Sequence, residues 1–218
     1  MSNYISTFVE RRIALATNLA EGRCGGSILD AFLILSSAMS AIASEVWPGE
    51  GIDKKRFTEL LVKYSNVSPS PSMVSVPLLY HSLDNDAISK SIVKSSFLKF
   101  NHGRILTDMD VDKNENELKA VLEKLDLRSI RKYSYACLFY TEFRSGLVHE
   151  GEVSENAYPV PITQRQAAVS YSNWESSRLI VFHFPWIIEI LRSIAFNLDP
   201  IFESLPLPSP KRWWTEGL

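Results

Sequence analysis

The segment AFLILSSAMSAIAS, residues 31–44, contains no charged residue and constrains the fold of this chain more than any other feature. It is shorter than the roughly 20 apolar residues that a helix needs to cross a membrane, and it is rich in serine and alanine. We therefore interpret it as part of a core helix over 28–46 in a soluble protein. Such a helix must pack against other elements to cover its apolar surface.

The chain has 218 residues, of which 45% are apolar, so it is long enough to bury a core of its own. Its 23 basic and 25 acidic residues nearly cancel, which argues against a protein that coats polyanions. Glu10 and paired arginines stand where a signal peptide has its apolar centre, so we expect no signal peptide. Cys24 and Cys137 predict two buried thiols and no disulfide framework, which fits the cytoplasm.

Apolar residues at three-and-four spacing, with helix breakers between them, predict a mainly α fold with long loops. Proline and serine make residues 66–77 a loop, and two prolines limit any strand within 151–172 to an edge. We expect one domain over residues 1–198 and an extended tail containing proline and tryptophan over 199–218. The expected helices span residues 3–21, 28–46, 53–65, 85–100, a short stretch within 107–126, 128–151 and 173–197.

Patterns typical of ligand sites are incomplete in this chain. Asp108, Asp110 and Asp112 are spaced like a calcium loop, but lysines occupy the positions of its glycine and its final glutamate. We interpret these acids as a solvated segment that caps the next helix. The four histidines lack ligand-pair spacing, and no phosphate-binding glycine loop follows a strand. The sequence therefore predicts no metal site and no cofactor.

The tail carries Trp213 and Trp214 directly after Lys211 and Arg212. These rings can stack on nucleic acid bases, and they can equally dock the tail on its own domain or on a partner. Both alternatives stay open at the level of sequence.

The sequence FYTEFRSGLVHEG, residues 139–151, ends a long amphipathic segment and contains Arg144 and His149 around Gly146. Gly146 is expected to loosen the last helical turn, so that His149 swings toward Arg144 beside a long loop. Arg178 and His183 have the same spacing, but they lie in an apolar run that we interpret as the middle of a packed helix.

A helical bundle in which RSGLVHEG closes a long helix, with a further amphipathic helix after a loop, resembles the HEPN superfamily. Its ribonuclease members carry an arginine, a polar residue, a few spacers and a histidine, which Arg144, Ser145 and His149 match in that order. Serine departs from the asparagine, aspartate or histidine that is more usual after the arginine. The resemblance covers about residues 3–197, and the eight quoted residues are its specific part.

The resemblance implies cleavage of single-stranded RNA without a metal ion. The RNA 2′-hydroxyl would attack the adjacent phosphate while His149 exchanges the proton and Arg144 stabilises the negative charge. Acid and base together require two histidines, so we expect a homodimer in which both Arg–His pairs face one groove. The resemblance also implies a toxin or anti-phage effector, with an antitoxin or another protein as a candidate partner.

Two acids are candidates for orienting this pair. Glu45 lies in the last turn of the helix over 28–46, where the helix dipole disfavours an acid, so it is expected to have a partner such as Arg144 or His149. Glu150 follows the histidine directly and begins the loop.

Arg128, Arg131 and Lys132 precede the motif and are candidates for contacting the RNA backbone; the alternative is a solvated helix start. Two further interpretations remain beside the ribonuclease. In one, the chain is a non-catalytic HEPN-like module that binds a protein, and Arg144 and His149 only tie the helix end to its neighbours. In the other, the chain is an unrelated helical protein.

Overall fold

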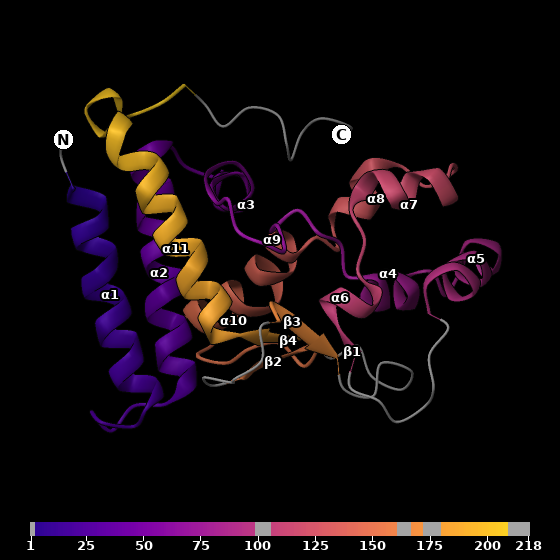
Figure 1. The fold of residues 1–218 in the computed structure, drawn as a ribbon, viewed down its shortest axis with the longest axis horizontal. Helices are drawn as coiled ribbons and strands as arrows, with labels where there is room; N and C mark the ends of the chain where they lie inside the picture. The colour runs from indigo at the N-terminus through magenta and orange to yellow at the C-terminus, as the bar shows by residue number, and fades with distance from the viewer. Residues whose placement is uncertain (1–2, 99–105, 161–166, 172–179, 209–218) are drawn as a thin grey trace.

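The computed structural model describes residues 3–98, 106–160, 167–171 and 180–208 (Figure 1). Helices account for 64% and strands for 8% of the structure, which confirms the mainly α class and adds a small mixed sheet. In Figure 1, long helices lie at the N-terminal end, the sheet lies in the middle, and shorter helices lie at the other end.

The long helices are α1 (Tyr4–Ala20), α2 (Ile28–Val46) and α11 (Phe184–Leu198), and α3 (Asp53–Tyr64) packs on the last two. Ser27 caps α2 by accepting the backbone N–H of Asp30. Among the described residues, α2 has the length and composition of a membrane span, but Phe32, Leu35 and Met39 are fully buried in the protein core. This packing agrees with the predicted core helix.

The sheet contains β1 (Leu106–Thr107), β2 (Ala157–Val160), β3 (Val169–Tyr171) and β4 (Ile180–His183) in the order β1-β3-β4-β2. Its strands β2 and β4 are parallel, and the other pairs are antiparallel.

The prediction of one helix over 173–197 is wrong for residues 180–183. Residues 180–183 form the buried strand β4, and α11 begins at Phe184 with Pro185 in its first turn. His183 ends the strand and hydrogen-bonds Ser170 across the sheet at 3.0 Å, so it does not lie in the middle of a helix. Arg178 lies outside the described residues.

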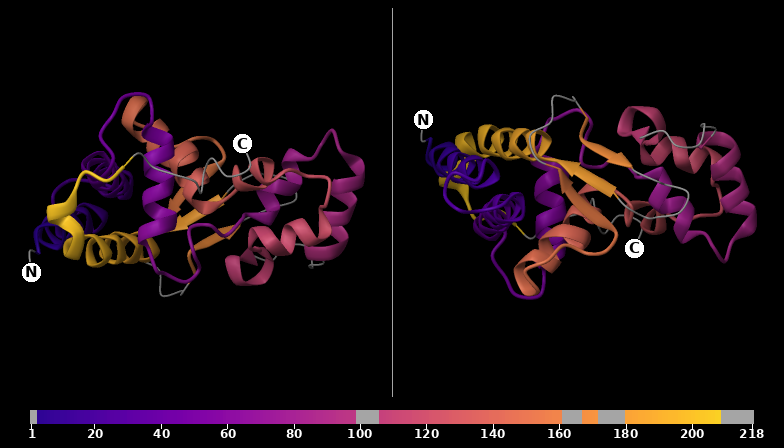
Figure 2. Two further views of the ribbon diagram at one scale, coloured as in Figure 1. Left: turned by 90° about the horizontal axis from the view of Figure 1, so that it is seen from above. Right: turned by 90° about the horizontal axis from the view of Figure 1, so that it is seen from below.

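The shorter helices gather at one end, beyond the sheet (Figure 2). They are α4 (Val76–Ser82), α5 (Ala87–Phe97), α6 (Asp108–Val111), α7 (Glu115–Val121) and α8 (Leu127–Arg131). Side chains cap most of them: Ser75 for α4, Asp86 for α5, Asn114 for α7 and Asp126 for α8.

The expected helix over 128–151 is divided. The helix α8 ends at Arg131, and the chain then pairs with residues 73–75, where Tyr135 N–H donates to the carbonyl of Met73. Ser134 caps a second helical run made of α9 (Tyr135–Leu138), the π-helical turn η1 (Phe139–Arg144) and α10 (Ser145–His149). This second run carries the Arg–His motif.

Residues 199–207, which the sequence assigns to a tail, pack on the helical domain. They begin with the 3₁₀ helix η2 (Asp199–Ser204), in which Asp199 accepts the backbone N–H of Ile5 at 2.8 Å. Phe202 stacks on Tyr4. The tail residues Trp213 and Trp214 lie outside the described residues.

The two cysteines differ in exposure. Cys137 is buried, and burial raises the pKa of its thiol to about 12. Cys24 is exposed on the turn after α1, which corrects the expectation that both thiols are buried.

Candidate functional site

Arg144 ends the π-helical turn and is held from two sides. Its Nε donates to Ser40 Oγ on α2 at 3.2 Å, and its Nη1 donates to the hydroxyl of Tyr140 at 3.4 Å. The guanidinium also lies 5.1 Å from the centre of the Tyr140 ring. Burial raises the pKa of Tyr140, so its phenol stays protonated at neutral pH. Neither Ser40 nor Tyr140 was predicted from the sequence, because neither lies within RSGLVHEG.

His149 is the last residue of α10 and is exposed. It forms no hydrogen bond with any part of the chain that the structure describes. Because α10 is a regular helix, a step of five residues turns the chain by about 500°, which places Arg144 and His149 about 140° apart around the axis. The structure therefore holds the guanidinium against α2 and leaves the imidazole in solvent, so the expectation that His149 swings toward Arg144 is wrong within one chain.

Gly146 has a different role from the one expected. It is helical, its carbonyl accepts the N–H of Glu150 at 2.7 Å, and the turn after α10 occurs at Gly151, where φ is +75°. A Cβ atom on Gly146 would overlap the backbone carbonyl of Glu152. Gly146 therefore does not loosen the helix; it lets the following loop fold back on it.

Glu142 fixes this loop from the helix side. Its backbone carbonyl accepts the N–H of Ser154 at 2.9 Å, and its carboxylate accepts the hydroxyl of Ser154 and the amide of Asn156. The loop that follows α10 contains further acids, which are Glu150, Glu152 and Glu155.

Among the described residues, none of the other predicted site residues near the motif forms a hydrogen bond with the guanidinium. Ser145 begins α10 and is half-buried, and Glu150 is exposed at the helix end. Glu45 is exposed and lines a hollow of about 260 Å³ between α1, α2 and η2. The helix α2 does contact the motif, but it does so through Ser40 rather than through Glu45.

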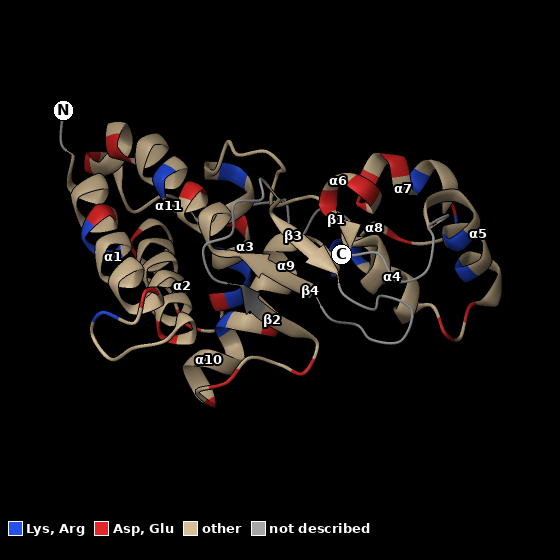
Figure 3. Cartoon of the chain, turned by 60° about the horizontal axis from the view of Figure 1, so that its bottom comes forward, with Lys and Arg blue, Asp and Glu red and all other residues tan. Residues whose placement is uncertain are grey.

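The predicted RNA-contacting residues lie on or directly after α8, away from α10 (Figure 3). Arg128 and Lys132 are exposed, whereas Arg131 is buried. The Nε and Nη2 of Arg131 donate to the carboxylate of Glu115 at 2.6 and 3.0 Å, in a bidentate ion pair. The expectation that Arg131 contacts RNA is therefore wrong, because this ion pair attaches α8 to α7.

A second polar cluster, which the sequence did not predict, surrounds Asp112. Its carboxylate accepts the hydroxyls of Tyr135 and Tyr171 and the backbone N–H of Val76. Burial raises the pKa of Asp112 to about 7, although the two phenolic hydrogen bonds oppose that shift.

Asp108 lies close to this cluster and is also buried, with 2% of its surface exposed. Its Oδ2 accepts the N–H of Ala168, while its Oδ1 has no hydrogen bond partner among the described residues. Burial raises the pKa of Asp108 as well. The expectation of a solvated acidic segment is therefore wrong for Asp108 and Asp112, whereas Asp110 caps α6 through the N–H and hydroxyl of Thr107.

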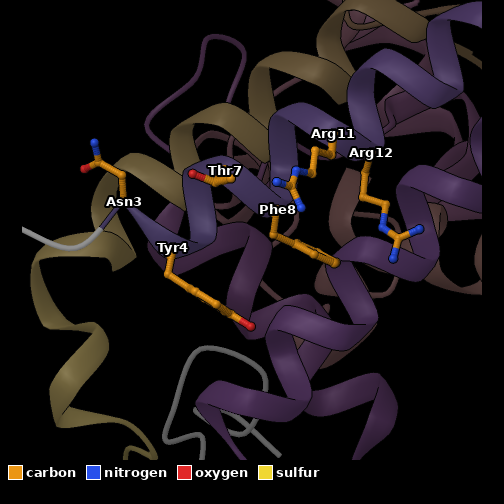
Figure 4. A pocket seen from close by; sticks show the side chains of 6 residues that line it. All are labelled: Asn3, Tyr4, Thr7, Phe8, Arg11 and Arg12. Atoms are coloured by element: carbon orange, nitrogen blue, oxygen red, sulfur yellow. The ribbon is translucent and has the colours of Figure 1, made fainter.

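A third candidate is a shallow hollow of about 590 Å³ on α1 (Figure 4). Tyr4, Phe8, Arg11 and Arg12 line it, and the Arg12 guanidinium lies 5.1 Å from the Phe8 ring centre. The described lining residues come from α1 and its N-cap alone, so this hollow is an open helix surface.

Comparisons of the chain with protein-family models, with curated proteins and with solved structures found no match. The HEPN resemblance therefore rests on the motif residues and on the helical class. Within the described residues, no group of three or more His, Cys, Asp or Glu side chains is arranged to hold a metal ion.

Proposed function

We propose that the chain is the subunit of a homodimeric, metal-independent endoribonuclease of the HEPN type, in which Arg144 and His149 act on the scissile phosphate of single-stranded RNA. The observation that carries the proposal is the exposed His149 on the same short helical run as a guanidinium held in place by Ser40 and Tyr140. A role as a cytoplasmic toxin or anti-phage effector, silenced by an antitoxin, belongs to the same proposal.

The contacts of Arg144 suit the stabilisation of negative charge. Its Nε and Nη1 bind the protein, while its Nη2 has no partner within the described residues. A fixed guanidinium with free N–H groups can bind a phosphoryl oxygen without first losing side-chain entropy. Ser40 and Tyr140 are therefore positioning residues.

The histidine supplies proton transfer. An imidazole that is exposed to solvent can accept the proton of the 2′-hydroxyl or donate one to the leaving 5′-oxygen. One chain supplies one such group, and a twofold axis near the end of α10 would supply the second. Val148, the neighbour of His149, is 42% exposed, so it can form an apolar contact between the two subunits at that axis.

A second candidate function is a non-catalytic module that binds a basic protein. The acidic loop after α10 favours it, because Glu150, Glu152 and Glu155 repel a phosphate backbone and attract basic side chains. In that case Arg144 only joins the motif to α2.

The test is cleavage of end-labelled single-stranded RNA in EDTA by the wild type and by Arg144→Ala. We expect fragments with 2′,3′-cyclic phosphate and 5′-hydroxyl ends, and a rate roughly 10²–10³-fold lower for the variant. Sedimentation of the wild type should give a dimer, and its rate per subunit should fall on dilution below the dimer dissociation constant. Equal cleavage by both proteins contradicts the proposal, and a folded dimer that leaves RNA intact favours the binding module.

A further inference from the structure

A hollow of about 820 Å³ lies between α6, the start of α11 and the segment 68–73. We propose that this hollow binds a small organic cation that carries an ammonium or guanidinium group on an apolar stem. The inference is independent of the ribonuclease, because the hollow shares no residue with the Arg–His motif.

The charge of the hollow favours a cation. Lys113 is the one basic side chain among the described residues that line it. Four acids line it, and they come from α6, the residue after α6, α7 and α11: Asp108, Asp112, Glu117 and Glu189. Because none of these acids belongs to a group arranged to hold a metal ion, the geometry favours an organic cation.

Asp108 offers an unused hydrogen bond acceptor at this place. It is buried and lines the hollow, and its Oδ1 has no donor among the described residues. A buried carboxylate oxygen without a donor is costly, so it is rare unless a ligand, a water or an ion completes it. An ammonium or guanidinium N–H supplies both the missing donor and the opposite charge.

Much of the remaining wall is apolar, and its one indole ring is held in place. The indole Nε1 of Trp186 donates to the carbonyl of Pro69 at 3.1 Å, which holds the ring at the start of α11. Met73 and Met109 line the same hollow. An alkyl stem can pack on these side chains, and a cation close to the indole face gains further attraction.

The affinity should depend on pH, because a cation binds a carboxylate better than a neutral carboxyl group. Burial raises the pKa of Asp112 to about 7, so this group is mostly neutral at pH 6 and mostly ionised at pH 8. Binding should therefore be tighter at pH 8 than at pH 6. The groups that surround Asp112 or line the hollow with it are Tyr135, Tyr171, Val76 N–H, Asp108, Lys113, Glu117 and Glu189.

The test is calorimetric titration of the full chain with agmatine at constant ionic strength. We expect saturable binding by the wild type and by Asp110→Asn, a matched change in the same helix that does not line the hollow. Asp108→Asn should weaken binding at least about tenfold, because it removes the charged acceptor. Tetramethylammonium, a cation without N–H donors, should not bind.

The proposal is overturned if agmatine does not bind, if Asp108→Asn binds it as well as the wild type, or if tetramethylammonium binds equally. If Asp108→Asn does not fold, Glu189→Gln is the second test of cation binding in this hollow. Glu189 is exposed, so its substitution leaves the core intact. We expect this variant to bind agmatine a few-fold more weakly, and unchanged binding overturns the proposal.

Discussion

The end of α10 and the Asp112 cluster use their polar groups in opposite ways. At the helix end, His149 is exposed and the Nη2 of Arg144 has no partner among the described residues, so both can meet a ligand in solvent. Around Asp112, two phenols and a backbone N–H satisfy a carboxylate that is 4% exposed. We therefore expect substitution of the exposed His149 to change activity with little effect on stability, and substitution of Asp112 to change stability.

The two regions also differ in how far apart their residues lie in the sequence. Arg144 and His149 lie on one helical run, so a short sequence motif is enough to identify them. The partners of Asp112 come from residues 76, 135 and 171, which only the folded chain brings together. The environment that raises the pKa of Asp112 therefore has no local pattern in the sequence.

The largest expected loss of stability is that of Arg131→Ala. Removing the buried Arg131 leaves the partly exposed Glu115 without its charge partner, so we expect the free energy of unfolding to fall by about 3 kcal/mol. Lys132→Ala, the exposed neighbour, should change it by less than about 0.5 kcal/mol. Urea denaturation measures both, and similar small effects would contradict the structural role of Arg131.

The next prediction concerns Asp112 and pH. Because burial raises its pKa to about 7, the folded protein binds a proton that the unfolded chain releases near pH 4. Its contribution to stability is therefore complete below about pH 4 and is lost as pH rises through 7. Between pH 5 and pH 8 this amounts to roughly 2.5 kcal/mol.

Asp112→Asn should remove most of that dependence, because an amide does not titrate. Denaturation of both proteins at pH 5 and pH 8 measures the difference. Parallel losses of stability in the wild type and the variant would show that Asp112 is not the titrating group.

A smaller effect is expected for Gly146→Ala. The new Cβ would overlap the carbonyl of Glu152, so either the helix or the loop must move, at a cost of about 1–3 kcal/mol. Ser145→Ala, in the same helix, is the control and should cost less than about 0.5 kcal/mol. A variant as stable as the wild type would mean that the loop does not pack on Gly146.

Much of the helical framework could be predicted from the sequence. The uncharged run within 28–46 places α2 correctly, because this signal is local. The buried strand β4 could not be separated from a helix, since a short apolar run fits either. The π-helical turn, the fold-back at Gly146 and the ion pair of Arg131 depend on contacts between distant residues, so periodicity did not predict them.

The candidate site could likewise be predicted only where the sequence signal is local. The motif itself identified Arg144 and His149, but the positioning contacts of Ser40 and Tyr140 appear only in the fold. Glu45 was expected near Arg144 because of its place in the helix dipole, and it lies instead in the hollow beside α1. Sequence position in a helix does not say which neighbour a side chain faces.

The most direct test of the account is the rate of RNA cleavage by His149→Ala, measured in EDTA beside its thermal melting curve. We predict a rate roughly 10²–10⁴-fold below that of the wild type and an unchanged melting temperature, because an exposed side chain without partners contributes little to folding. Cleavage at the wild-type rate by the folded variant would contradict the assignment of His149 as the proton-transferring residue.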